Sequence, residues 1–303
     1  MLNKLIANML PHIPKKLVWV FSKRYIAGET IDEGLLASKL LNEKKIEVTI
    51  DLLGEFIKTL EEARVNKNQY VEIIKRFTSE KVTGNFSLKP TMFGLLIDKE
   101  ACHNYIRDVV ALAAQKNHFV RIDMEDSSCV DMEIELFKKL RTEFPKNVGL
   151  VLQAYLRRTM SDLENLSLIN SESHPINFRL CKGIYVEPEK IAFKGYQEVR
   201  DNFLNDLDFM FRNKMFAAIA THDIFLVDNA LQMIEKYKIS KSMYEFQMLY
   251  GVTPDLRQSI VDRGHKMRIY VPFGKQWFNY STRRLKENPK MAAEIIKALF
   301  IRG

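Results

Sequence analysis

The chain has 303 residues, of which 47% are hydrophobic and 28% are charged, and its formal net charge is +8. This is an ordinary globular composition, with enough apolar material for one large α/β barrel or two smaller domains. Its three cysteines are far apart and form no Cys-x-x-Cys pair, so neither a disulfide framework nor a zinc site is indicated, and a reducing compartment fits best.

The first 28 residues form a basic arm, because they contain five lysine or arginine side chains and no acid. The longest apolar run in this arm, Leu17–Phe21, has five residues, far fewer than the ~20 that span a bilayer. We expect two short helices packed against the body of the protein. The alternative is a basic, aromatic arm that contacts an anionic membrane, and both can hold together.

After the arm, strand-like runs alternate with amphipathic helical stretches, and the runs start 24 to 38 residues apart. This spacing is typical of βα units, and eight of them predict a closed parallel barrel. We therefore expect an N-terminal helical arm over residues 1–45 and a (β/α)8 TIM-like barrel over residues 46–303. The predicted strands are Glu47–Leu53, Asn85–Lys89, Phe119–Glu125, Val148–Tyr155, Asn177–Gly183, Met215–Thr221, Tyr244–Leu249 and Arg268–Pro272.

Polar residues gather at the C-terminal ends of these runs, where barrel enzymes carry their chemistry. Side chains alternate along a strand with period two, so residues two apart share a face. The residues singled out by this rule are Lys89, Arg121, Asp123, Glu125, Gln153, Tyr155, Arg157, Arg179, Lys182, Thr221, His222 and Tyr270.

The segment after the eighth strand has the pattern of an anion-binding helix. Its polar side chains share one face because they are spaced i, i+3, i+4 and i+7, and they are Tyr280, Arg283, Arg284 and Glu287. Arginine forks match the two oxygens of a carboxylate, whereas a solvated, salt-bridged surface is the commoner alternative. The position after the eighth strand favours binding.

Two further features concern the barrel interior. Asp123 is either the structural partner of Arg121 or Arg179, or a member of a site network. We favour the network, because several unpaired buried charges on one strand are costly. The run Arg179–Tyr185, with Arg179, Lys182 and Gly183, fits an anionic cofactor and an ordinary turn equally well.

Several site types lack their sequence signature. His222 has no second histidine at ligand spacing, so no metal centre is expected. The chain contains no Gly-x-Ser-x-Gly elbow, no phosphate-binding P-loop and no Gly-x-Gly-x-x-Gly fingerprint. Any nucleotide cofactor must therefore bind without a Rossmann turn.

Taken in order, the motifs of this chain resemble those of the monofunctional proline dehydrogenases, which are flavin-dependent (β/α)8-barrel enzymes. Each motif alone is weak, but nine in the right order across almost the whole chain are specific. They are Tyr25–Thr30, Ser87–Pro90, Arg121–Glu125, Leu152–Tyr155, Arg179–Tyr185, Ala220–Asp223, Tyr244–Gly251, Arg268–Gly274 and Arg283–Asn288.

The resemblance implies oxidation of L-proline to Δ1-pyrroline-5-carboxylate with FAD as cofactor and a membrane quinone as electron acceptor. It implies that Lys89, Arg283 and Arg284 hold the proline carboxylate and that Glu287 orients the arginines. Leu249 and Tyr270 would wall the pyrrolidine ring, with Tyr280 nearby. Asp123 and Arg179 would be catalytic. The residues implied at FAD are Met124, Gln153, Arg179, Lys182, Gly183, Ile184, Thr221 and His222.

The resemblance also has implications for substrate specificity and subcellular localisation. Related enzymes that act on hydroxyproline carry a small serine where this chain has Tyr270, so tyrosine argues for proline. We expect a cytoplasmic protein without a nucleic-acid partner, with a peripheral contact at the inner membrane as an open alternative. Two other functions stay open: another FAD-dependent barrel oxidoreductase, and a non-catalytic sensor of proline or flavin.

Overall fold

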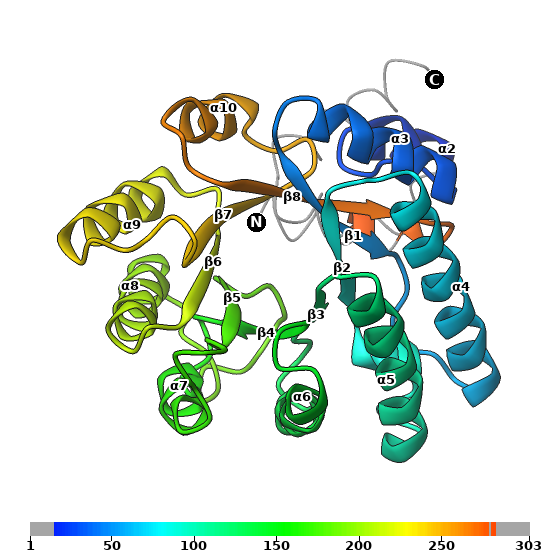
Figure 1. The fold of residues 1–303 in the computed structure, drawn as a ribbon, viewed down its shortest axis with the longest axis horizontal. Helices are drawn as coiled ribbons and strands as arrows, with labels where there is room; N and C mark the ends of the chain where they lie inside the picture. The colour runs from blue at the N-terminus through cyan, green and yellow to red at the C-terminus, as the bar shows by residue number, and fades with distance from the viewer. Residues whose placement is uncertain (1–14, 279, 283–303) are drawn as a thin grey trace.

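Eight parallel strands close into a barrel in chain order in the computed structural model, which describes residues 15–278 and 280–282 (Figure 1). The strands are β1 (Glu47–Leu52), β2 (Gly84–Leu88), β3 (Val120–Ile122), β4 (Val148–Gln153), β5 (Asn177–Cys181), β6 (Phe216–Ala220), β7 (Tyr244–Leu249) and β8 (Met267–Phe273). The barrel closes where β8 pairs with β1, with Ile269 opposite Val48. The predicted TIM-like (β/α)8 barrel is confirmed.

Helices surround the barrel as an outer ring (Figure 1). The helices after β1 to β7 are α4 (Leu60–Ser79), α5 (Lys99–Gln115), α6 (Val130–Glu143), α7 (Thr159–Ser167), α8 (Tyr196–Arg212), α9 (Ile224–Lys236) and α10 (Pro254–Asp262). A short 3-10 helix, η2 (Pro90–Phe93), precedes α5. From residue 15 onward, α2 (Lys15–Ser22) and α3 (Ile31–Asn42) precede the barrel. Within the described residues, no helix combines the length and hydropathy that a membrane crossing needs.

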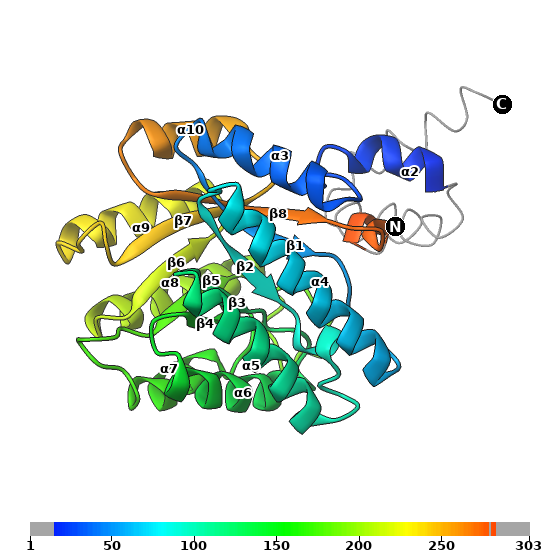
Figure 2. The same cartoon turned by 45° about the vertical axis from the view of Figure 1, so that its right-hand side comes forward.

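The seam between β8 and β1 is covered by α3, which contacts both strands (Figure 2). Thr30 starts α3 with a capping box, in which its hydroxyl accepts from the Glu33 amide and the Glu33 carboxylate accepts from the Thr30 amide. The preceding Glu29 accepts a 2.6 Å hydrogen bond from Trp277 Nε1, and Trp277 also contacts Trp19. The motif before α3 therefore holds the chain that follows β8.

The predicted strands start within one residue of the observed ones, but β3 is much shorter than predicted. It covers Val120–Ile122 instead of Phe119–Glu125. Its ladder with β2 ends at the pair Leu88–Ile122. After Leu88 the chain leads into Pro90, which has no N–H and begins η2, so the bonds between β2 and β3 end with the one from the Asp123 amide to the Leu88 carbonyl.

The interior of the barrel is polar, whereas the outward face of its strands is apolar. Outward residues such as Ile50, Phe86 and Ile269 are fully buried under the helices. Inside, Arg268 is paired with Glu245 at 2.7 Å. Burial alone would raise the pKa of Glu245, but the attraction of Arg268 outweighs it and lowers the pKa to about 2. Such a pair persists only because its partners satisfy each other.

Candidate active site

A cavity of about 550 Å³ opens at the C-terminal ends of the strands. It is lined by all the described residues to which the family resemblance assigns a site role: Lys89, Asp123, Met124, Gln153, Arg179, Lys182, Gly183, Ile184, Thr221, His222, Leu249, Tyr270 and Tyr280. The predicted Arg283, Arg284 and Glu287 lie outside the described residues. The cavity volume falls in the range of small-molecule and cofactor sites.

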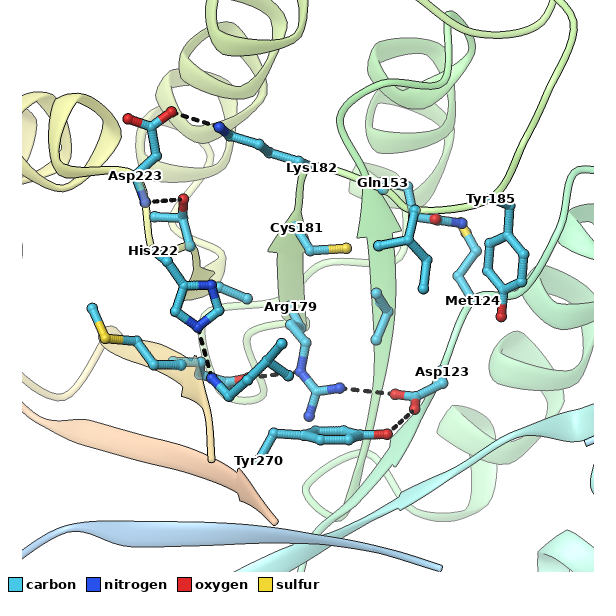
Figure 3. A pocket seen from close by; sticks show the side chains of 18 of the residues that line it. Asp123, Met124, Gln153, Arg179, Cys181, Lys182, Tyr185, His222, Asp223 and Tyr270 are labelled. Carbon is cyan, nitrogen blue, oxygen red and sulfur yellow. Dashed lines mark hydrogen bonds and ion pairs between the residues drawn. The ribbon is translucent and has the colours of Figure 1, made fainter. Parts of the chain in front are cut away.

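Asp123 is the hub of the polar network at the base of this cavity (Figure 3). Its Oδ1 accepts hydrogen bonds from Arg179 Nη1 at 2.8 Å and from Ser87 Oγ at 2.6 Å. Its Oδ2 accepts from the Tyr270 hydroxyl at 3.0 Å. Asp123 is 9% exposed and Arg179 is 6% exposed, so this ion pair is almost dry. Of the two arginine partners considered for Asp123, the structure selects Arg179.

Burial, followed by the nearby negative charge of Asp123, raises the pKa of Tyr270 well above its ordinary value. Tyr270 therefore stays a neutral phenol and acts as a donor to Asp123. Its ring also lies 5.2 Å from the Arg179 guanidinium carbon, so one tyrosine contacts both members of the ion pair.

Arg179 is oriented from below by Gln247, a residue that sequence reasoning missed. Arg179 Nε donates to Gln247 Oε1 at 2.6 Å, and Gln247 Nε2 donates to Glu245 Oε1 at 2.6 Å. Because Glu245 is paired with Arg268, the amide of Gln247 has one satisfying orientation, with its oxygen toward Arg179. The detectable signal was the alternation of Glu245 and Gln247 on one face of β7.

One nitrogen of Arg179 remains available to a ligand. Arg179 Nη2 is buried and has no hydrogen-bond partner among the described residues. A buried guanidinium N–H without an acceptor is costly, so such a group at a cavity wall fits an acceptor supplied by a bound molecule.

Lys89 reaches the cavity from the end of β2 and is held by Asp51, a second residue that sequence reasoning missed. Lys89 Nζ donates to Asp51 Oδ1 at 2.7 Å and lies 3.4 Å from the Tyr270 hydroxyl. Asp51 is fully buried and lies on β1, opposite Ser87. Lys89 and Tyr270 on the cavity wall are therefore bonded to two carboxylates, Asp51 behind the wall and Asp123 on it.

The mouth of the cavity carries a cationic cluster around Asp223. This carboxylate accepts from Lys182 Nζ at 2.5 Å, from Arg200 at 2.7 and 2.8 Å, and from the Tyr196 hydroxyl at 2.9 Å. Burial opposes ionisation, but Arg200, Lys182 and Tyr196 together hold the pKa of Asp223 below its ordinary value. Two cations around one carboxylate leave a net charge of +1, which suits an anionic group.

Gly183 and His222 both fix the shape of the cavity wall. Gly183 has φ +101°, and a Cβ there would lie 2.1 Å from the Tyr155 ring, so the loop after β5 requires glycine to pack on Tyr155. The close approach of a cofactor is not needed to explain this glycine. His222 Nε2 accepts from the Leu249 amide at 2.9 Å, which ties the end of β6 to the end of β7.

Arg121 and Glu125, expected to share the face of Asp123, do not line the cavity. Arg121 lies deeper in the barrel, where Nη1 donates to the carbonyls of Leu150 at 3.2 Å and Asn177 at 2.6 Å. Glu125 turns away and accepts from the Thr91 amide and hydroxyl at 2.9 and 2.6 Å. The reason is that β3 ends at Ile122, so period-two alternation does not extend to Glu125.

Arg157, grouped with Gln153 and Tyr155 by the same rule, also misses the cavity. Its Nε donates to the Glu189 carbonyl at 2.9 Å, and its guanidinium stacks over Phe193 at 4.4 Å. Here too the strand is shorter than predicted, because β4 ends at Gln153.

A closed parallel barrel with a buried ion pair and a lined cavity at its C-terminal face has the architecture of a (β/α)8-barrel enzyme. The comparisons with known proteins specify this class. The family model for proline dehydrogenase matches residues 36–296. The chain therefore belongs to the proline dehydrogenase family, whose members are oxidoreductases of proline catabolism.

Named relatives cover nearly the whole chain. "Proline dehydrogenase 2" of Bacillus subtilis strain 168 is 33% identical over 280 residues, which are 92% of this chain and 90% of that protein. "Proline dehydrogenase" of Deinococcus radiodurans is 29% identical and covers 95% of this chain and 92% of its own length.

A solved structure supports the same relationship. The structure of proline utilization A from Bdellovibrio bacteriovorus, inactivated by N-propargylglycine, has a TM-score of 0.84 and 29% identity. The match covers 88% of this chain but only 32% of that longer protein.

Proposed function

We propose that this protein oxidises L-proline to Δ1-pyrroline-5-carboxylate with bound FAD and passes the electrons to a membrane quinone. The observation that carries the proposal is the network of Asp123, Arg179, Tyr270 and Lys89 on one cavity wall. Membership of the proline dehydrogenase family supports the substrate.

The residues at the cavity fit FAD at two points. Arg179 Nη2, which has no partner among the described residues, is a donor for an acceptor atom of the cofactor ring. The +1 cluster of Lys182, Arg200 and Asp223 suits its phosphates. Between these points we propose cofactor contacts for Met124, Gln153, Gly183, Ile184, Thr221 and His222, all of which line the same cavity. Bound FAD supplies the acceptor for the hydride that leaves the ring carbon beside the proline nitrogen.

The protein's own groups bind and orient a zwitterion. Proline carries a carboxylate, which we assign to Lys89 together with Arg283 and Arg284, oriented by Glu287. Charge-assisted hydrogen bonds to these groups neutralise the carboxylate in a site with little water. The pyrrolidine ring is assigned to the wall formed by Leu249 and Tyr270, with Tyr280 beside it. Asp123 holds Arg179 and Tyr270 in place by direct hydrogen bonds.

The color of the protein tests the proposal. Purified protein loaded with FAD should be yellow and should bleach without oxygen when L-proline is added, and a soluble quinone analogue should restore the colour. Protein that takes up no FAD would overturn the proposal. Bleaching by NADH but not by proline would favour another flavin-dependent barrel reductase, and FAD uptake without bleaching by either would favour a sensor.

Replacing Tyr270 with serine should extend the substrate range to 4-hydroxyproline, because the smaller side chain leaves room for the added hydroxyl. The same change removes the 3.0 Å hydrogen bond to Asp123, so kcat/KM for L-proline should fall about tenfold, the equivalent of ~1.4 kcal/mol. Steady-state kinetics with both substrates measure these effects. Tyr270→Phe is the matched control, since it loses the hydroxyl but keeps the ring and should gain no hydroxyproline turnover. A Tyr270→Ser enzyme that does not oxidise 4-hydroxyproline would contradict the role of Tyr270 in specificity.

A further inference from the structure

Asp51 is a buried carboxylate that lies behind the cavity wall. It is fully buried and lies on β1, and it is paired with Lys89, which is 8% exposed and lines the cavity. The Lys89 ammonium has three donors; one points at Asp51 at 2.7 Å and another at the Tyr270 hydroxyl at 3.4 Å. Lys89 itself lines the cavity, so its ammonium is within reach of a molecule bound there.

The charge state of Lys89 depends on its acidic neighbours. Burial alone would lower the pKa of Lys89, but the attraction of Asp51, then of Asp123 and more weakly of Glu55, outweighs burial and raises the pKa. Burial also raises the pKa of Asp51, against the opposing effect of Lys89. Asp123 already accepts from Arg179, so Asp51 is the carboxylate whose closest cation is Lys89.

We propose that Asp51 is a positioning residue for substrate binding: it keeps the buried Lys89 protonated and aims its ammonium at the substrate carboxylate. This inference rests on the proposed oxidation of proline, and it adds that the affinity for an anionic substrate depends on a residue that the substrate does not touch. It predicts that the effect of Asp51 is specific to ligands with a carboxylate.

The first test measures KM and kcat for L-proline between pH 7 and 9.5 in the FAD-loaded wild-type protein and in Asp51→Asn. Without Asp51, burial dominates and Lys89 loses its proton at lower pH. The basic (high-pH) limb of the pH profile of kcat/KM should therefore shift to lower pH by about one unit or more. At pH 8.5, KM should be about tenfold above that of the wild type, with kcat changed less than about threefold.

Two comparisons separate positioning from a general disturbance of the fold. Prolinamide has the ring and the amine but no carboxylate, so its KM should be the same in the wild type and in Asp51→Asn. Asp162→Asn is the matched control variant: Asp162 is 7% exposed and is paired with Arg158 at 2.8 Å on α7, outside the cavity. Its partner, an arginine, keeps its charge throughout this pH range, so KM and its pH dependence should not change.

A second test does not need enzyme activity. In the wild type the raised pKa of Lys89 means that its contribution to stability is present at neutral pH and is lost only when the pH exceeds the unfolded value of about 10.4. In Asp51→Asn the folded protein prefers neutral Lys89, so unfolding takes up a proton and the variant gains stability relative to the wild type as pH rises. The deficit in Tm of Asp51→Asn should thus shrink by about half from pH 7.5 to 9.5.

The outcomes are distinct. If L-proline does not reduce the FAD bound to the wild-type protein, the proposed function is refuted. The Tm comparison would still test the Asp51–Lys89 pairing. Three results would overturn the inference. The first is an Asp51→Asn variant whose KM for L-proline and whose basic limb of the kcat/KM pH profile equal those of the wild type. The others are an equal rise in KM for prolinamide, and a Tm deficit that does not change with pH. If Asp51→Asn does not fold, Asp51→Glu replaces it. That variant keeps the charge but moves it, so KM for proline should rise with the basic limb in place, and an unchanged KM would refute positioning.

Discussion

Replacing Asp123 with asparagine should lower kcat/KM for L-proline by about 10²–10³-fold, equivalent to ~3–4 kcal/mol. The physical reason is the loss of the carboxylate that accepts from both Arg179 and Tyr270. The buried guanidinium then keeps its charge without its ionised partner, and the tyrosine loses its acceptor. Stopped-flow reduction of the bound flavin by proline measures this loss directly.

Ser87→Ala is the matched control for this prediction. Ser87 donates to the same Asp123 oxygen at 2.6 Å but is neutral. Removing one neutral donor costs about 1 kcal/mol, so the control should lose less than about tenfold. Equal losses in the two variants would show that the charge of Asp123 is not what matters, and an Asp123→Asn protein with normal reduction would remove Asp123 from the catalytic network.

Arg179→Lys should lower the rate of flavin reduction by about 10²-fold, although the formal charge is unchanged. Arginine holds Gln247 through Nε at 2.6 Å and Asp123 through Nη1 at 2.8 Å, and its Nη2 has no partner among the described residues. A lysine ammonium on a different stem cannot reproduce these three directions. The midpoint potential of the bound flavin should become more negative by about 30 mV or more, the equivalent of ~1.4 kcal/mol for two electrons.

The control here is Arg158→Lys. Arg158 forms a comparable fork with Asp162, at 2.8 and 3.0 Å, but it directly precedes α7 and does not line the cavity. Its replacement should leave the reduction rate and the potential as in the wild type. If Arg179→Lys also behaves like the wild type, the fork geometry of Arg179 is irrelevant and only positive charge is needed.

The fold was predictable because its signals are local. Strand starts are set by apolar, β-branched runs that follow polar loops, and all eight were predicted within one residue of the observed positions. Strand ends were less predictable because they depend on the neighbouring strand. β3 ends at Ile122 because β2 runs into Pro90, 32 residues earlier in the chain, and this error put Glu125 on the wrong face.

The site was predictable as a set of residues and unpredictable as a network. Every described residue to which the family resemblance assigned a site role lines one cavity, because the C-terminal ends of parallel strands meet at one edge of the barrel. Which residues pair with one another was not predictable. Arg121 looked as suitable as Arg179 for Asp123, but it lies deeper, against the carbonyls of β4 and β5. The arginine clamp expected at Arg283 and Arg284 remains a prediction, since those residues lie outside the described part.

The eight βα units, the polar character of the strand ends and the order of the family motifs can be read from the sequence alone. Which charges meet depends on the closed barrel. Lys89 and Asp51 are 38 residues apart in the chain, and Arg179 and Gln247 are 68 apart. They pair because closure of the barrel sets the register of its strands and turns these side chains into one interior. Burial then makes each pairing strong, since a charge inside the barrel has few other partners.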